Sequence, residues 1–190
     1  MCLTVKTSIK SNKLTQEVYD MAKNECIKPT EKTMKCYKIL EKITNRKTGK
    51  VQYKTPYTGT KFKVNGDGKN KAKGGLKVLY SHTALDFYAN GSVSLKINDG
   101  MFHAFKHYKD AVDEAGIMNR DDGTFKYKYI QLKEGESYMD YDTEYVVAEC
   151  SIPVGTMYSE GIFYRFISIS DYKHEYESCA ATQMNVKKIC

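Results

Sequence analysis

Several residue types are scarce or missing in this 190-residue chain. It has no tryptophan and three prolines, and three of its 30 basic residues are arginine. Lysine is well solvated but lacks the guanidinium fork that reads bases and clamps phosphates through paired contacts. No stretch approaches the ~18 consecutive apolar residues that a membrane span needs. We therefore expect no membrane segment, and a basic character carried almost entirely by lysine.

Two further absences concern the cellular compartment. The first six residues contain too short an apolar run for a signal peptide. The six cysteines include no Cys-x-x-Cys pair, which argues against a structural zinc site. Because disulfides persist mainly in oxidising compartments, we expect a cytoplasmic protein whose thiols stay reduced.

The formal net charge of +7 is distributed unevenly along the chain. Residues 1–80 contain 19 Lys or Arg against 6 Asp or Glu, whereas residues 81–190 contain 11 against 17. This polarity favours an anionic partner for the first half, or self-association of basic on acidic surfaces. A solvated surface explains it equally well.

Length and periodicity predict a single domain over residues 1–190. The chain is long enough to bury a core, and no linker, repeat or low-complexity tract divides it. We expect about eight short strands among the segments of alternating or apolar sequence. These segments are residues 3–9, 34–43, 51–53, 76–80, 93–97, 101–105, 124–132, 145–152, 162–169 and 184–189.

Two or three helices accompany these strands. The first begins near Thr15 and repeats apolar residues at helical spacing until Pro29 closes it. The second covers residues 107–115, with Gly116 in the place of a C-terminal cap. Residues 171–182 favour a short helix or an irregular arm. The fold class that follows is α+β, with a mostly antiparallel sheet.

The histidines do not form a convincing metal motif. His103 and His107 have the spacing of two ligands on one helical face, but the sequence around His103 alternates like a strand. Ala104 also stands where a zinc protease motif needs glutamate. We expect no metal and no cofactor, and the lack of a catalytic constellation favours a protein that is not an enzyme.

The sixteen tyrosines and the lysines of residues 61–77 are the most informative features. Tyrosine suits protein interfaces as well as cores, because it joins a large apolar ring to a polar tip. Phe125, Tyr127 and Tyr129 alternate with lysines, a mixture of charge and stacking that single-stranded nucleic acid uses. We expect segment 61–77 to form a basic hairpin. Its candidate anion contacts are Lys61, Lys63, Lys69, Lys71, Lys73 and Lys77.

Short motifs spread over most of the chain suggest relatives. They are Met-Cys-Leu-Thr at 1–4, Cys-Tyr-Lys-Ile-Leu at 36–40, Thr-Pro-Tyr at 55–57, Met-Phe-His-Ala-Phe at 101–105 and Ile-Pro-x-Gly-Thr-x-Tyr at 152–158. With them the chain resembles a group of small uncharacterised proteins of gut Bacteroidales bacteria and their phages, including crAss-like phages. It departs from these at Val154, where lysine is common. The resemblance implies a phage-related setting, in the host cytoplasm or the virion, and no particular activity.

Three functional hypotheses are compatible with these features. The leading one is a non-enzymatic phage or phage-related accessory protein that acts through protein contacts or self-association, in the virion or in host takeover. The second is a nucleic-acid-binding protein that uses the basic segment 61–77. The third is a small-molecule-binding protein or enzyme with a pocket in which Tyr57, His103 and Tyr158 converge.

Overall fold

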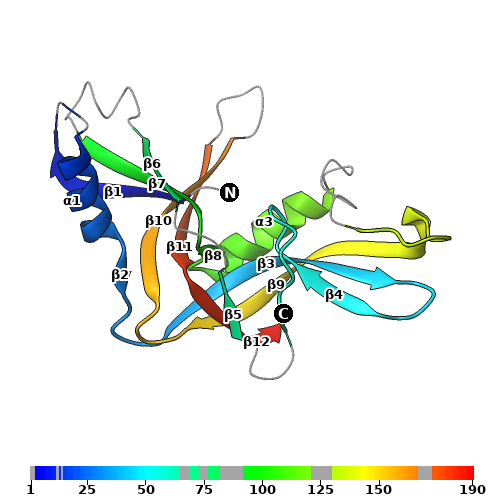
Figure 1. Cartoon of the computed structure of the whole chain (residues 1–190). Helices are drawn as coiled ribbons and strands as arrows, with labels where there is room; N and C mark the ends of the chain where they lie inside the picture. Colours follow the sequence, from blue (N-terminus) through cyan, green and yellow to red (C-terminus); the bar gives the residue numbers. More distant parts are fainter. Residues whose placement is uncertain are drawn as a thin grey trace.

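Strands make up most of the fold. The computed structural model of the chain describes residues 3–11, 13, 15–64, 69–72, 77–81, 92–120, 130–166 and 173–190. Over these residues the helices are α1 (Gln16–Cys26), α3 (Tyr108–Arg120) and the short 3-10 helix η1 (Tyr138–Asp140) (Figure 1). The strands are β1 (Leu3–Lys10), β2 (Lys28–Pro29), β3 (Met34–Asn45), β4 (Val51–Lys54), β5 (Lys69–Lys71), β6 (Lys77–Ser81), β7 (Ser92–Asp99), β8 (Phe102–Phe105), β9 (Tyr141–Ile152), β10 (Met157–Phe166), β11 (Lys173–Ala181) and β12 (Gln183–Ile189).

These strands pair into one continuous antiparallel sheet. The order along it is β5-β12-β9-β3-β8-β11-β10-β1-β7-β6, with β2 beside β10 and β4 beside β3. The expected α+β class with mostly antiparallel pairing is confirmed, although the described residues form more strands than the eight expected. In Figure 1, β3 and β9 extend together to one end of the molecule, and α1 lies at the other end beside β1 and β7.

The first helix begins where the sequence predicts. The hydroxyl of Thr15 accepts a hydrogen bond from the Val18 N–H at 3.2 Å, so the side chain satisfies one of the amides that a helix leaves free at its start. Ala22 on the inner face of α1 packs against Val93 and Leu95 of β7. Local capping and apolar spacing therefore determine this element.

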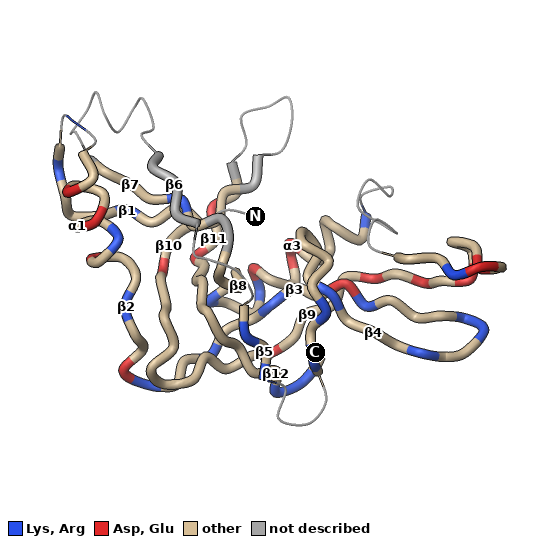
Figure 2. The backbone as a smooth tube through the Cα atoms, in the orientation of Figure 1, with Lys and Arg blue, Asp and Glu red and all other residues tan. Residues whose placement is uncertain are grey.

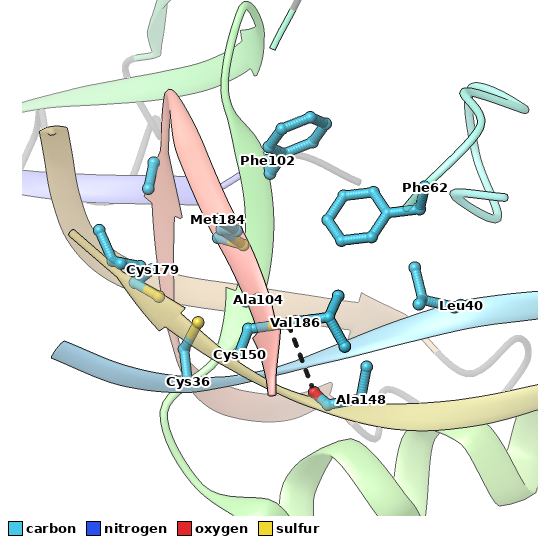
Figure 3. Close-up of a cluster of buried hydrophobic side chains, with 12 residues drawn as sticks. Cys36, Leu40, Phe62, Phe102, Ala104, Ala148, Cys150, Cys179, Met184 and Val186 are labelled. Carbon is cyan, nitrogen blue, oxygen red and sulfur yellow. Dashed lines mark hydrogen bonds between the residues drawn. The ribbon is translucent and has the colours of Figure 1, made fainter. Parts of the chain in front are cut away.

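Alternation along β3 places two cores on opposite faces of the sheet. One core, here called the Phe62 cluster, takes Cys36 and Leu40 from β3 and faces β12 (Figure 3). The other, here called the Phe105 cluster, takes Ile39 from β3 and lies beneath α3. Because successive side chains of a strand point to opposite faces, the side chain of Lys38 points to the same face of the sheet as those of Cys36 and Leu40.

One edge of β3 changes partner along its length. β3 pairs with β8 at Tyr37 and with β4 from Glu41 onward, whereas its other edge pairs with β9 throughout. Residues 38–40 have no partner strand on the changing edge among the described residues. The turn at residues 55–58, which follows β4, borders this gap in the sheet. The gap positions the pocket described below.

Two helix predictions are wrong. α3 continues through Gly116 to Arg120, so this glycine is an interior helical residue and not a C-terminal cap. Residues 171–182, expected as a short helix or irregular arm, contain strand β11, which lies between β8 and β10. Hydrogen bonding on both edges of β11 overrides the weak helical preference of its alanines and glutamates.

The basic segment 61–77 does not form the expected hairpin. β5 pairs with β12 and β6 pairs with β7, and these two strands lie at opposite ends of the strand order. A local turn signal cannot reveal pairing with strands more than a hundred residues away, as for β5 and β12. Among its described lysines, Lys69 and Lys71 belong to β5, Lys77 belongs to β6, and Lys61 and Lys63 follow β4 outside the named strands.

Candidate functional site

A pocket of about 200 Å³ lies in the gap beside residues 38–40. β3, β8 and the turn after β4 each contribute to its wall. Its lining residues are Lys38, Ile39, Thr55, Pro56, Tyr57, Thr58, Met101, Phe102, His103 and Phe105. Most of this wall is apolar, so the few polar groups determine what the pocket can recognise.

Lys38 is the most unusual of these polar groups. Its side chain crosses the gap, and Nζ donates a hydrogen bond to the His103 carbonyl oxygen at 2.6 Å. Nζ also lies 5.9 Å from the ring centroids of both Phe62 and Phe102, and these rings meet edge to face (Figure 3). The residue is 6% exposed. Burial lowers the pKa of this amine from 10.5 to about 8.

Lys38 has no ion-pair partner among the described residues. A second buried lysine, Lys54 in the adjacent strand, lies opposite the buried carboxylate of Glu41, whose negative charge partly offsets the lowering of the Lys54 pKa by burial. A buried charge is normally paired, because leaving water is expensive for an isolated ion. Within the described part of the chain, the amine of Lys38 meets one carbonyl oxygen and two aromatic faces.

His103 supplies a second unsatisfied group. Both of its ring nitrogens are buried, and neither has a hydrogen-bond partner in the described part of the chain. Burial, together with the nearby charge of Lys38, lowers the pKa of the imidazole to about 3. The ring is therefore neutral at pH 7, with one donor and one acceptor to offer. Its place in β8, apart from His107 in the turn before α3, agrees with the strand expected there.

The structure brings together two of the three residues proposed for a ligand pocket. Tyr57 and His103 both line it, whereas Tyr158 does not. Tyr158 is half-buried in β10, against the Phe62 cluster, and its hydroxyl donates to Glu160 at 2.5 Å. β11 lies between β10 and β8 and so separates this tyrosine from the pocket strand.

Sequence reasoning missed Lys38, although a signal was present. In the alternating run of β3 it takes the inward position between Cys36 and Leu40, where an apolar residue is expected. A lysine on the inward face of a strand predicts either a buried carboxylate that pairs with it or a ligand-binding site. Only the structure distinguishes these two cases, because the residues around the amine come from segments that are distant in sequence.

A second concave surface collects four of the six lysines proposed as anion contacts. We call it the basic groove. It encloses about 1050 Å³, and Lys61, Lys63, Lys69 and Lys71 line it. Lys73 lies outside the described residues, as does the aromatic run of residues 125–129. Lys77 belongs to β6, at the far end of the strand order from the groove.

Ion pairs between the two halves of the chain cancel part of its charge polarity. Four join a basic residue of β3, or of the turn after it, to an acidic residue of β9 or η1. Figure 2 shows basic and acidic stretches of chain near one another where β3 and β9 extend to the end of the molecule that carries β4. A fifth pair, formed by Lys106, lies within the acidic second half and does not link the halves. The pairs are Lys35 with Glu149, Lys42 with Glu144, Arg46 with Asp142, Lys47 with Asp140, and Lys106 with Glu160. The polarity therefore has a partly internal explanation.

Comparisons with known proteins do not identify a relative of this chain. No protein-family model, no curated protein and no solved structure matches the chain. Among the described residues, no cluster of three or more His, Cys, Asp or Glu side chains could hold a metal ion. In the same part of the chain, no helix is long and apolar enough to cross a membrane.

Proposed function

We propose that the protein binds a small carboxylate-bearing molecule in the pocket beside Lys38. The observation that carries the proposal is a lysine amine that is buried, lines a cavity and has no carboxylate partner among the described residues. This deepens the third sequence hypothesis by adding the charged group that fixes the ligand's chemistry.

A carboxylate suits Lys38 for electrostatic reasons. Attraction between opposite charges is several times stronger in a partly buried site than in water, and hydrogen bonds to charged groups are shorter and stronger than neutral ones. A ligand carboxylate would also supply the counter-charge that Glu41 supplies to Lys54. Binding therefore removes the uncompensated charge of the empty site, which a neutral ligand of the same shape cannot do.

The remaining wall limits the size and shape of the ligand. A cavity of about 150 Å³ holds one benzene ring, so the 200 Å³ here accommodates a single ring or a short chain. Ile39, Phe102 and Phe105 give it apolar contacts. The neutral imidazole of His103 offers one hydrogen bond to a hydroxyl or a carboxyl oxygen.

Isothermal titration calorimetry tests the proposal directly. Benzoate, hexanoate and succinate are titrated into the protein at pH 7, and benzamide serves as the neutral match to benzoate. We expect at least one carboxylate to bind with a one-to-one ratio, and benzamide to bind at least about tenfold more weakly than benzoate. At pH 10 the affinity falls, because Lys38, with a pKa of about 8 in the empty site, is then largely neutral.

Two variants separate the site from nonspecific attraction. Lys38→Met keeps the apolar length of the side chain and is expected to abolish carboxylate binding. Lys42→Met removes a half-buried, ion-paired lysine from the same strand and should leave binding unchanged. The proposal fails if no carboxylate binds in the millimolar range, if benzamide binds as well as benzoate, or if Lys38→Met retains full affinity.

The leading sequence hypothesis, an accessory protein that acts through protein contacts, stays a prediction. Its support from charge polarity is reduced by the ion pairs between β3 and β9. Its support from tyrosine abundance is unchanged. Co-purification of a stable partner from the natural host would favour it, and a chain that binds a carboxylate in the pocket remains compatible with it.

A further inference from the structure

The basic groove is built from two short segments with the same alternation. In one segment Phe62 points into the core between Lys61 and Lys63, and in the other Asn70 points inward between Lys69 and Lys71. Each inward side chain fixes its segment, while the flanking lysines stay exposed on the outside. The four ammonium groups therefore stand on ordered backbone and not on an independent loop.

Asn70 connects the two segments. Its side-chain oxygen accepts a hydrogen bond from the Lys63 N–H at 2.7 Å, and its side-chain nitrogen donates to the Lys63 carbonyl at 3.0 Å. β5 is held in turn by pairing with β12, and the backbone of Lys61 forms an isolated antiparallel β-bridge with the backbone of Lys54 in β4. The lysine pairs of the two segments consequently have a defined spacing before any ligand arrives, which lowers the entropy lost on binding.

The four groove lysines carry charges that no carboxylate of the described residues neutralises. None of the four forms an ion pair with a described residue, and all are exposed. In contrast, Lys35, Lys42, Lys47 and Lys106 are each paired with a carboxylate. Other lysines, such as Lys6 and Lys23, also lack ion pairs with described residues, but the groove gathers four of these unneutralised charges at one concave surface, where they attract anions together.

We propose that the basic groove binds single-stranded nucleic acid without sequence preference. Lysines contact phosphates as point charges and do not read base edges, which predicts affinity without specificity. Between the lysines the groove wall carries half-buried Tyr53 and exposed Val51, which offer an aromatic face and an apolar surface to unstacked bases. Proteins that bind single strands combine a basic groove with such stacking surfaces.

Fluorescence anisotropy with a labelled 20-residue oligothymidine at low salt tests this inference. The variant that changes Lys61, Lys63, Lys69 and Lys71 to Gln is compared with a control that changes the paired lysines Lys35, Lys42, Lys47 and Lys106 to Gln. Both lower the net charge of +7 by the same amount. Loss of the groove lysines is expected to weaken binding roughly tenfold or more, and the control to change it less than about threefold. Circular dichroism verifies that both variants fold.

Competition experiments distinguish the class of anion. Unlabelled oligothymidine and an oligoadenosine RNA should displace the probe about equally, whereas a 20-base-pair duplex and polyglutamate should displace it poorly. Equal loss of affinity in both variants would mean that net charge alone is responsible and would overturn the proposal. Displacement by polyglutamate as effective as by oligothymidine would overturn it in favour of an acidic protein partner. Neither outcome bears on carboxylate binding beside Lys38, which the groove substitutions leave intact.

Discussion

Lys38 and Lys54 are buried lysines in neighbouring strands with different surroundings. Lys54 is 7% exposed and lies opposite Glu41 across the β3 and β4 pairing. Lys38 is buried to a similar degree, and among the described residues its amine meets a carbonyl oxygen and two phenylalanine rings. A negative charge nearby favours the protonated amine of Lys54, and the described residues place no such carboxylate beside Lys38, so loss of the charge should be tolerated better at Lys38 than at Lys54.

The pH dependence of Lys38→Met follows from the lowered pKa of the native amine. Between pH 8 and 10.5 the folded chain releases the Lys38 proton while the unfolded chain keeps it, so the stability of the wild-type protein rises with pH in this window. Relative to Lys38→Met, the wild type should gain up to about 3 kcal/mol of unfolding free energy across it. Urea unfolding of both proteins at pH 7, 9 and 10.5 measures the difference. A difference that stays constant with pH would show that Lys38 titrates normally.

His103 gives a second residue-level prediction at acid pH. The unfolded chain binds a proton at this imidazole near pH 6.5, whereas the folded chain does not until about pH 3, so stability is lost as pH falls through this window. In nitrogen-detected NMR at pH 5, the His103 ring should still be neutral. His103→Phe should lose less stability between pH 6.5 and 4 than the wild type. An imidazole that titrates with a midpoint near 6.5 would contradict both expectations.

At the scale of single elements, two glycines have opposite roles. A Cβ atom added to Gly161 in β10 would lie 2.2 Å from the Thr4 carbonyl oxygen, because the backbone of the paired strand β1 lies close to this position. A Cβ added to Gly116 in α3 would meet nothing within 4 Å. Gly161→Ala should therefore destabilise the protein by about 1–3 kcal/mol, and Gly116→Ala should stabilise it by about 0.5–1 kcal/mol. Chemical denaturation of the two variants checks both signs, and a neutral Gly161→Ala would disprove the close approach of β1.

Asn119 attaches the end of α3 to the sheet. Its amide nitrogen donates to the Tyr145 carbonyl at 2.9 Å, and its amide oxygen accepts from the Tyr145 N–H at 2.8 Å. The side chain thus takes the place of a neighbouring strand at this point of β9. Loss of two hydrogen bonds in Asn119→Ala should lower the unfolding free energy by about 1–2 kcal/mol.

Arg120→Ala, at the adjacent exposed helical position, provides the control for Asn119→Ala. It should change the unfolding free energy by less than about 0.5 kcal/mol. Hydrogen exchange of the Tyr145 amide should accelerate in Asn119→Ala and stay unchanged in Arg120→Ala. Equal protection of this amide in both variants would show that the Asn119 contact does not form in solution.

Local signals predict the elements of this fold better than their partners. Thr15 and the apolar spacing after it determine the start of α1, and alternation around His103 correctly places a strand there. The same reasoning fails for β11, whose strand state depends on β8 and β10, and for Gly116, where helical neighbours outweigh a cap signal. The pocket is harder still to predict, because it exists only where the partner of β3 changes from β8 to β4.

Over the whole molecule, ion pairing determines which charges remain available to a ligand, more than their position in the first or second half of the sequence does. The basic first half and acidic second half meet along β3 and β9, where Lys42 and Arg46 are neutralised by Glu144 and Asp142. The net charge of +7 attracts any polyanion from a distance. Direct contact with phosphates, in contrast, requires lysines that no carboxylate neutralises. Replacing such lysines should therefore change the salt dependence of binding, whereas replacing paired lysines should not.

The salt dependence of oligothymidine binding separates these effects. Four groove lysines that each neutralise one phosphate release counterions, so the logarithm of the association constant should fall with the logarithm of salt concentration at a slope of about −3. The groove variant should have a slope close to zero, and the control variant in which the four paired lysines are replaced should keep the wild-type slope, because those lysines already neutralise carboxylates. If both variants lose the same fraction of the slope, attraction arises from net charge and the groove makes no phosphate contact. If the control variant keeps the wild-type slope and the groove variant loses it, the phosphate contacts lie in the basic groove, whose two segments Asn70 connects.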